Sequence, residues 1–504
     1  MRRIAVAVLS VTLTTTGIAA SFTDEDLVPS DVLAPAGLVK YWQCPIPLRA
    51  GEIIDSLHLE DEMLYALTDR GAVYAVDAEV GLVRWSAVLP EPPFRVFRPT
   101  HARTDDPKAR MEVYVAGGTH LRVYHRRTGE LLSDLQLPFP ASGPAIGDGR
   151  FIHIGSVNNR YYCLRAMPEG LAVPEPDRRG NKWYAIVVLP NGKRLFEEAE
   201  SLAKARQWQE SWISRFGGIG AERKTVMIRW QLDTSGTVVA RPAVVDKVSY
   251  ISMEDGRQIP SVVDKIAYIP SDGGKLFACG LRGKQKYWEA QAAAGILADP
   301  LVDKGVVYFA STDRSLYAVD RIQGTPLWQC YLPVPLRRTG YLTEKVIYQP
   351  GEPTGVYAVD AESGKLLWCC EEARDFLARQ DTWVYLFEPG RAIHQVQAGT
   401  GRITRSMACP AATVSVGNPR DTTWYLTDGS RRLMCIRPKD VPYLRRARFD
   451  DALLGSVESK ASASRPTTAG PTAATRSGSE QVDDPLRSRS TIPPAVDANP
   501  QTGK

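Results

Sequence analysis

The chain has 504 residues, of which 44% are hydrophobic and 24% are charged, a balance typical of a globular protein with a sizeable core. Its formal net charge is only +5. The one short basic cluster, Arg445, Arg446 and Arg448, is typical of a solvated surface, so the charge argues against a nucleic-acid partner. Forty glycines and 36 prolines indicate many turns, and therefore short strands rather than long helices.

The N-terminus has the pattern of a secretory signal peptide. Arg2 and Arg3 precede the uncharged stretch 4–20, which ends in small residues and is followed by acidic ones. A basic start, a short apolar core and a small-residue end are typical of a cleavable signal. We therefore expect residues 1–20 to be removed and the chain to be exported to the periplasm or cell envelope. No transmembrane segment is expected in the mature chain.

One sequence unit occurs three times. "AVYAVDAEVGLVRW" spans residues 72–85, "SLYAVDRIQGTPLW" spans 315–328 and "GVYAVDAESGKLLW" spans 355–368. In each unit an alternating strand pattern ends at an aspartate, a glycine follows four residues later, and a tryptophan four residues after that. Aspartate can accept hydrogen bonds from amides two residues on, and glycine takes a positive φ without steric cost, so the unit predicts strand, tight turn, strand. The predicted turn residues are Asp77, Gly81, Asp320, Gly324, Asp360 and Gly364.

The spacing of these units predicts a β-propeller. Trp288, Trp328 and Trp368 are separated by 40 residues twice in succession, and another hairpin lies upstream of each unit. Four short antiparallel strands in about 40 residues, repeated along the chain, are typical of propeller blades. We predict an all-β fold over residues 37–440, an eight-bladed β-propeller of four-stranded antiparallel blades. Seven blades are the alternative, because residues 230–288 contain two similar hairpins within one period.

Several repeats are incomplete. Ser133 and Arg405 stand where the tryptophan of the unit would be, and residues 422–438 supply three strands without a fourth. A lone strand around Trp42 precedes the first full unit. We expect this N-terminal strand to complete the last blade and close the ring, because closure leaves no exposed sheet edge.

Two segments do not fit the repeat. Residues 168–224 interrupt the third blade with a strand-like stretch, a Pro-Asn-Gly turn and apolar residues at helical spacing, which predict a small α/β insertion. These apolar residues either pack onto the propeller or form a partner-binding surface; they are Leu195, Ala199, Leu202, Ala205, Trp212 and Phe216. Residues 450–504 have no aromatic residue and are rich in Ser, Thr, Ala and Pro, which predicts a disordered tail.

The repeated unit resembles the pyrroloquinoline-quinone (PQQ) repeat of quinoprotein alcohol dehydrogenase-like propellers. The resemblance covers about residues 37–440 without the insertion. It implies that the recurring tryptophans dock each blade onto its neighbour: Trp42, Trp85, Trp230, Trp288, Trp328 and Trp368. The same repeat occurs in dehydrogenases that hold PQQ and Ca²⁺. It also occurs in non-catalytic envelope proteins, such as the propeller subunit of the outer-membrane β-barrel assembly machinery, so the fold alone does not choose between these functions.

The cysteines bear on this choice. Some quinoprotein dehydrogenases carry a disulfide between adjacent cysteines beside the cofactor, and Cys369 and Cys370 are adjacent. Neighbouring side chains of a strand point to opposite faces, however, and Cys44 and Cys330 occupy the same position as Cys370, two residues after a tryptophan. Packing is therefore the favoured role. If the ring closes as predicted, Cys44 and Cys435 lie on adjacent strands and are a candidate disulfide.

No catalytic, cofactor-binding or metal-binding set of residues is evident. The six histidines lack paired ligand spacing, and the turn aspartates already have a structural role. We therefore expect a non-catalytic scaffold without a cofactor, a monomer within a larger complex that binds an envelope protein or cell-wall component through one face of the ring. The alternative is a quinoprotein dehydrogenase that uses PQQ and calcium to oxidise an alcohol or a sugar.

Overall fold

The structure, a computed structural model, describes residues 25–89, 95–104, 106–167, 171–189, 192–216, 225–252, 258–281, 283–353 and 355–440. These residues all belong to one unit of the chain, residues 1–452. The predicted signal peptide, residues 1–20, and the predicted disordered tail, residues 450–504, lie outside the described residues.

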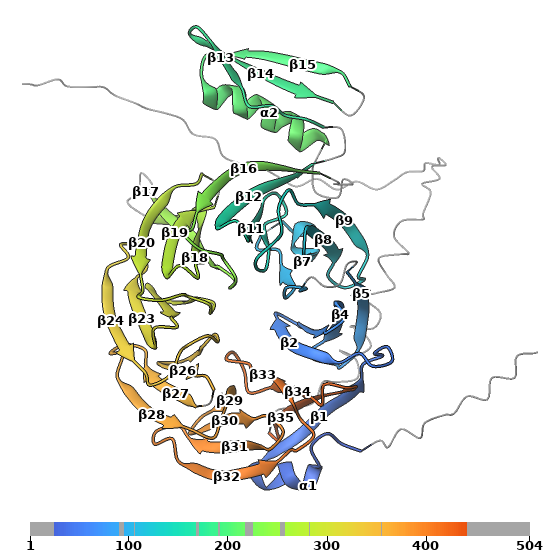
Figure 1. The fold of residues 1–504 in the computed structure, drawn as a ribbon, viewed down its shortest axis with the longest axis vertical. Helices are drawn as coiled ribbons and strands as arrows, with labels where there is room; N and C mark the ends of the chain where they lie inside the picture. The colour runs from blue at the N-terminus through green and yellow to red at the C-terminus, as the bar shows by residue number, and fades with distance from the viewer. Residues whose placement is uncertain are drawn as a thin grey trace, which may run out of the picture. The chain divides into compact units, whose positions relative to one another are not determined.

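Four-stranded antiparallel sheets make up most of the described chain. Eight such sheets are present in these residues, and Figure 1 shows them around a ring, with strands such as β24, β28 and β32 on the outside. Sheets 1 to 4 consist of β2 (Ile54–Glu60), β3 (Met63–Thr68), β4 (Ala72–Asp77) and β5 (Val83–Val88); β6 (Thr100–His101), β7 (Glu112–Gly117), β8 (His120–His125) and β9 (Leu131–Gln136); β10 (Ile146–Gly147), β11 (Ile152–Ser156), β12 (Arg160–Met167) and β16 (Thr225–Asp233); and β17 (Ala243–Ser252), β18 (Gln258–Pro270), β19 (Lys275–Gly280) and β20 (Lys286–Gln291).

Sheets 5 to 8 continue the series, and the last of them uses the N-terminal strand. They consist of β21 (Leu301–Asp303), β22 (Val306–Ala310), β23 (Ser315–Asp320) and β24 (Pro326–Tyr331); β25 (Tyr341–Thr343), β26 (Val346–Pro350), β27 (Val356–Asp360) and β28 (Leu366–Cys370); β29 (Asp375–Gln380), β30 (Trp383–Glu388), β31 (Ala392–Gln397) and β32 (Ile403–Ala408); and β33 (Val414–Val416), β34 (Trp424–Thr427), β35 (Arg432–Pro438) and β1 (Leu38–Pro45). The fold is thus the predicted all-β propeller.

The ring closes through strand β1. This strand pairs antiparallel with β35, with Leu38 opposite Pro438 and Gln43 opposite Met434, and so becomes the fourth strand of sheet 8. A short helix, α1 (Ser30–Leu33), and a 3-10 turn (Ala34–Ala36) precede it. Because the edge of β35 is covered by β1, sheet 8 has the same four-stranded form as its neighbours.

The tryptophans of the fourth strands lie between consecutive sheets. Each indole N–H donates to a main-chain carbonyl at the last turn of the next sheet, at 2.7–3.2 Å; the pairs are Trp42–Ala78, Trp85–Arg126, Trp230–Leu281, Trp288–Arg321, Trp328–Ala361 and Trp368–Ala398. In five of the six contacts, the residue three positions after the acceptor is a glycine that lies against the indole. These glycines are Gly81, Gly129, Gly324, Gly364 and Gly401. After Leu281 this place is taken by Lys284, which also has a positive φ, of 57°.

The turn residues of the three full units share one geometry. The side-chain Oδ1 of Asp320 accepts hydrogen bonds from the amides of Ile322 and Gln323, at 2.8 and 2.7 Å. The amide of Gly324 donates to the carbonyl of Asp320 at 2.9 Å, and this glycine has a φ of 72°. Asp77 with Gly81 and Asp360 with Gly364 repeat the arrangement, including the φ of 72°.

We predict that the close contact between this glycine and the indole excludes residues with a Cβ from this position of the turn. A Cβ added at Gly401, where φ is 72°, would lie 2.7 Å from Cδ2 of Trp368. Gly401→Ala should therefore lower the free energy of unfolding by about 2 kcal/mol, from left-handed backbone strain together with displacement of the ring. Thermal unfolding followed by circular dichroism measures the effect. The matched control is Gly399→Ala in the same turn, where the new Cβ meets nothing within 4 Å; equal melting temperatures for the two variants would contradict the docking geometry.

Sheets 2 and 7 lack the docking tryptophan on their fourth strands, β9 and β32. Ser133 on β9 faces sheet 3, whose turn between its third and fourth strands is replaced by the insertion. Arg405 on β32 faces sheet 8, whose third and fourth strands, β35 and β1, come from opposite ends of the described chain. In the described part of the chain, neither neighbour has a tight turn between its third and fourth strands on which an indole could dock. Sheets 7 and 8 instead meet through Tyr385 and Trp424, whose rings stack with centroids 4.8 Å apart.

The two similar hairpins of residues 230–288 belong to a single sheet. They supply β17, β18 and β19, and the first two strands are long, with 10 and 13 residues. Sheet 4 is therefore enlarged, and the two hairpins do not form two separate sheets.

The insertion lies between β12 and β16 of sheet 3. It forms a three-stranded sheet of β13 (Asp177–Arg179), β14 (Lys182–Val188) and β15 (Arg194–Ala199), followed by helix α2 (Leu202–Phe216). The predicted helical spacing is wrong for Leu195 and Ala199, because residues 194–199 form a strand that pairs with β14. Apolar residues of the insertion, such as Val187 and Ile213, pack with Met167 of sheet 3. Neither described helix has the length and hydropathy needed to cross a membrane.

The cysteine pairs singled out from the sequence are not bonded. Cys44 lies opposite Leu433, whereas Cys435 lies opposite Trp42, so the two cysteines are diagonal neighbours on β1 and β35. Diagonal side chains are farther apart than the Cβ–Cβ distance of a disulfide, and both thiols are free. The candidate Cys44–Cys435 bridge is therefore wrong. Cys369 and Cys370 are also free, and they lie opposite Tyr357 and Val356.

Candidate functional site

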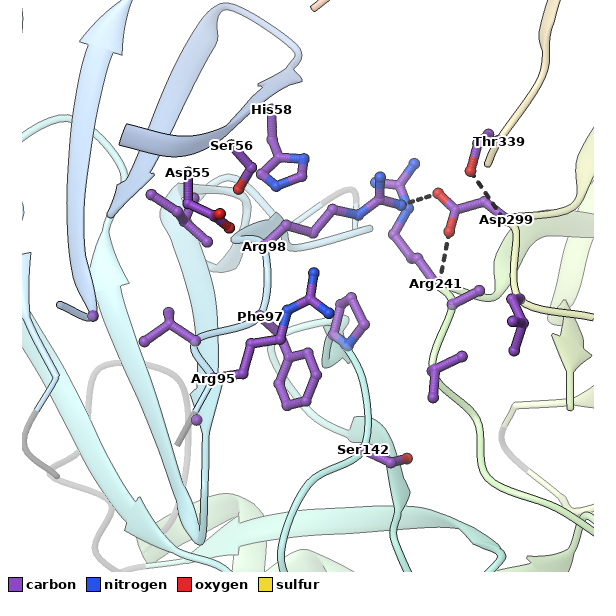
Figure 2. A pocket seen from close by; sticks show the side chains of 18 of the residues that line it. Asp55, Ser56, His58, Arg95, Phe97, Arg98, Ser142, Arg241, Asp299 and Thr339 are labelled. Carbon is purple, nitrogen blue, oxygen red and sulfur yellow. Dashed lines mark hydrogen bonds and ion pairs between the residues drawn. The ribbon is translucent and has the colours of Figure 1, made fainter. Parts of the chain in front are cut away.

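A central pocket of about 960 Å³ is lined by residues from sheets 1 to 6. The first strand of each sheet lies nearest the middle of the ring, so the segments that lead into these strands converge there. They bring together charged and titratable side chains from distant parts of the sequence, including His58, Arg95, Arg98, Arg241 and Asp299 (Figure 2).

Ion pairs cross the ring at one side of this pocket. The guanidinium of Arg98 pairs with Asp299, whose other carboxylate oxygen accepts the main-chain amide of Arg241 at 2.8 Å (Figure 2). The amide of Asp299 in turn donates to the hydroxyl of Thr339 at 3.0 Å. These contacts join sheets 2, 4, 5 and 6, because each residue lies just before or within the first strand of its sheet.

Glu60 connects this network to sheet 1. Its carboxylate accepts hydrogen bonds from Arg241 at 2.6 Å and from Arg103 at 2.5 Å, although the residue is only 8% exposed. Burial alone would raise the pKa of Glu60, but the guanidinium groups of Arg241 and Arg103 outweigh burial, and the pKa is lowered. Arg241 also lines a second pocket, of about 700 Å³, together with His101 and Arg103. The ion pairs therefore lie where the two pockets adjoin.

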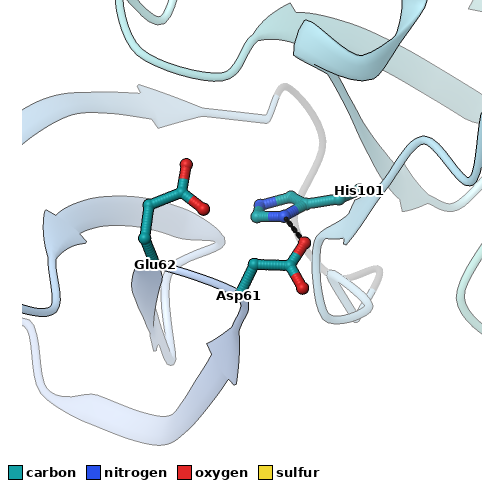
Figure 3. Close-up of side chains that lie close together, drawn as sticks. All are labelled: Asp61, Glu62 and His101. Atoms are coloured by element: carbon teal, nitrogen blue, oxygen red, sulfur yellow. Dashed lines mark hydrogen bonds and ion pairs between the residues drawn. The ribbon is translucent and has the colours of Figure 1, made fainter. Parts of the chain in front are cut away.

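A cluster of Asp61, Glu62 and His101 is the one described group whose geometry could hold a metal ion (Figure 3). Its carboxylates already have cationic partners. Arg126 pairs with Glu62 and, at 3.3 Å, with Asp61. The imidazole of His101 lies 2.8 Å from Asp61 and 2.8 Å from the hydroxyl of Tyr65. The hydrogen bond from His101 is the largest cause that holds the pKa of Asp61 well below its usual range.

This cluster therefore works as a contact between sheets 1 and 2. Tyr65 is fully buried, so its hydroxyl cannot reach a substrate, and burial raises its pKa well above the usual value. With Arg126 beside the carboxylates, a metal ion would have to displace an existing positive charge. The arrangement fits a structural hydrogen-bond chain better than a metal centre.

The residues singled out from the sequence lie away from the central pocket. The tryptophans and turn aspartates lie at the contacts between outer strands, and none of them lines the pocket. Sequence reasoning missed the pocket residues because they occur once each, outside the repeated unit. One signal was present: arginines recur just before the first strands of sheets 2, 4 and 6, at Arg98, Arg241 and Arg338.

Comparisons with known proteins extend the resemblance. A family model described as outer membrane protein assembly factor BamB matches residues 256–376. The crystal structure of BamB from Moraxella catarrhalis superposes with a TM-score of 0.52 at 12% sequence identity, covering 81% of this chain and 99% of that chain. The chain is a β-propeller that resembles BamB, and residues 256–376 carry the match to its PQQ-type repeat.

Two further comparisons do not bear on the assignment. The computationally designed Ika8 protein matches with a TM-score of 0.45 at 11% identity, covering 76% of this chain and 96% of that one. No curated protein matches the sequence. At such low identity the structural likeness to BamB establishes the fold, and the predicted PQQ-repeat propeller is confirmed in this respect.

Two histidines, the buried His153 and the half-buried His58, predict how the stability of this BamB-like propeller depends on pH. Burial, then the charge of Arg98, lowers the pKa of His58 to about 3, and burial lowers that of His153 to about 4. Neither ring nitrogen of His153 has a hydrogen-bond partner among the described residues. Because both folded-state pKa values lie below the usual value of about 6.5, their contribution to stability is fully present above pH 6.5 and is lost as the pH falls toward 4 and 3.

The measurement is the urea midpoint of unfolding between pH 7.5 and pH 4.5. We expect the midpoint to fall steadily below pH 6.5 in the wild type and to fall less steeply in His153→Gln, which cannot gain the proton. The groups facing His153 are the uncharged Tyr161 and Trp230 rings, with Asp148 near enough to oppose the shift. Parallel pH profiles for the two proteins would show that His153 does not titrate as described.

Proposed function

We propose that this chain is an exported, non-catalytic scaffold of the cell envelope that binds a protein or cell-wall partner through one face of the propeller ring. The observation that carries the proposal is the match of residues 256–376 to the family model of an outer membrane protein assembly factor. The predicted signal peptide and the fold shared with BamB support it. On this proposal the chain works as a single copy within a larger complex.

The residues of the ring centre do not fit a calcium–quinone pair. Calcium takes six to eight oxygen ligands, mostly from carboxylates and carbonyls. In the central pocket Asp299 is held by Arg98 and by the amide of Arg241, and Glu60 is held by Arg241 and Arg103. The cluster of Asp61 and Glu62 is matched by Arg126. We therefore propose that the protein functions without PQQ or calcium.

Site-specific photo-crosslinking in intact cells tests the scaffold proposal. A photo-reactive amino acid at Ile53 would lie beside the central pocket, because this residue is 52% exposed and its amide donates to the pocket residue Asp69. The same group at Leu327, which is 52% exposed on the outer strand β24, is the matched control.

A partner attached at position 53 but not at position 327 would support binding through the ring face. Crosslinks at position 327 alone would place the partner on the outer strands and contradict it. Dye reduction by the purified protein with PQQ, Ca²⁺ and an alcohol or sugar would overturn the non-catalytic assignment and favour the dehydrogenase alternative.

A further inference from the structure

One cation in the central pocket has no side-chain partner among the described residues. Arg95 is exposed on the segment that leads into sheet 2, and its guanidinium points into the pocket (Figure 2). Among the described residues it makes no side-chain hydrogen bond or ion pair. The imidazole of His58 points into the same space and likewise has no hydrogen-bond partner in the described part of the chain.

Arginines outnumber carboxylates around the pocket. The lining arginines are Arg70, Arg95, Arg98, Arg241, Arg337 and Arg338. Four carboxylates line it as well. Asp299 and Glu352 pair with arginines, Asp69 accepts the amide of Ile53, and Asp55 is exposed.

The charges that act on His58 in the pocket are mainly positive. After burial, the charges of Arg98, Arg95 and Arg241 all lower the pKa of His58, and Asp299 alone opposes them. A positive field that keeps an imidazole uncharged favours a negatively charged group at the same place. The pocket is therefore better suited to an anion than to a neutral or cationic ligand.

The arginines are distributed from the interior of the pocket to its mouth. The side chains of Arg98 and Arg241 are 23% and 26% exposed, whereas those of Arg338 and Arg337 are 40% and 52% exposed. A cavity of about 960 Å³ is much larger than one small anion requires. Guanidinium groups at several depths instead match carboxylates spaced along an extended chain.

We propose that the central pocket receives an acidic segment of a partner protein, with Arg95 pairing with one of its carboxylates. This proposal rests on the proposed scaffold function and names the chemistry of the partner. Of the three arginines nearest His58, Arg98 and Arg241 pair with their own carboxylates, which leaves Arg95 available for the incoming chain. The approach of the acidic segment would be accelerated by the surrounding positive charge and weakened by salt.

Fluorescence anisotropy with a labelled hexaglutamate peptide and the full purified chain tests this inference at low salt. We expect saturable binding that a hexalysine peptide does not show. Arg95→Gln should weaken binding about tenfold, the effect of one charge-assisted hydrogen bond. Because Arg95 has no described side-chain partner, the substitution should leave the melting temperature unchanged. The matched control is Arg402→Gln, which removes an exposed arginine from the turn between β31 and β32.

Three results would overturn the inference: no hexaglutamate binding by the wild type, equal weakening by Arg95→Gln and Arg402→Gln, or free citrate binding as tightly as the peptide. The last result would make the pocket a site for small anions. The scaffold proposal is tested separately. If the crosslink at position 53 persists in Arg95→Glu cells, a partner binds the ring face but does not place a carboxylate at Arg95.

Discussion

Replacing Trp368 with alanine is expected to lower the free energy of unfolding by about 4 kcal/mol, because it removes a large buried side chain from the contact between two sheets. The indole is 7% exposed, its N–H donates to the carbonyl of Ala398 at 2.7 Å, and its ring packs against Tyr348 with centroids 5.8 Å apart. Alanine would leave a cavity between sheets 6 and 7 and an unpaired carbonyl. Urea unfolding followed by circular dichroism measures the loss.

Trp368→Phe is the control that separates packing from hydrogen bonding. Phenylalanine keeps much of the apolar contact but cannot donate to Ala398, so it should cost substantially less than alanine, with about 1 kcal/mol from the lost hydrogen bond. If the alanine and phenylalanine variants unfold at the same urea concentration, the bulk of the ring does not hold these sheets together, and the docking role of the tryptophans would have to be abandoned.

The second large effect is expected from Glu60→Gln in the middle of the ring. The change keeps the shape of the side chain but removes the charge that Arg241 and Arg103 face. Since Glu60 is 8% exposed, leaving Arg241 without its carboxylate should lower the free energy of unfolding by about 3 kcal/mol. Thermal unfolding should show a clear decrease in melting temperature.

The control for this prediction is Glu289→Gln, which makes the same chemical change in an exposed position. Glu289 pairs with Lys275 and Lys286 on the outer part of sheet 4, where water screens both partners. Exposed ion pairs contribute little, so its melting temperature should remain close to that of the wild type. A Glu60→Gln variant as stable as Glu289→Gln would show that the central ion pairs do not contribute to stability.

The outer framework could be predicted from the sequence because one interaction generates it repeatedly. Each tryptophan docks on a turn of the next sheet that presents a free carbonyl and a glycine, whose lack of a Cβ leaves room for the indole. This contact sets the sequence spacing between the tryptophans and between the turns. Even the irregular positions follow this rule. Ser133 and Arg405 replace tryptophan where the next sheet has no tight turn to receive it. The insertion and the ring closure thus account for the two incomplete units.

The centre of the ring could not be predicted in this way. Arg241 and Glu60 are 181 residues apart, and Arg98 and Asp299 are 201 apart, so no short pattern joins them. Each pair depends on where the sheets place the segments that lead into their first strands. The disulfide prediction failed for a related reason. Adjacency of β1 and β35 was predicted, but the register that sets Cys44 opposite Leu433 is not visible in the sequence.

Strand β1 has a consequence for how the protein is made. Among the described strands, β1 emerges first from the ribosome, and its partner β35 emerges last. Glu25 and Arg432, which hydrogen-bond across this junction, are 407 residues apart. Such a long-range pairing is slow to form, and until it forms both strands have open edges that could join another chain. A shortened chain that lacks β1 would therefore be prone to associate with other chains through the open edge of β35.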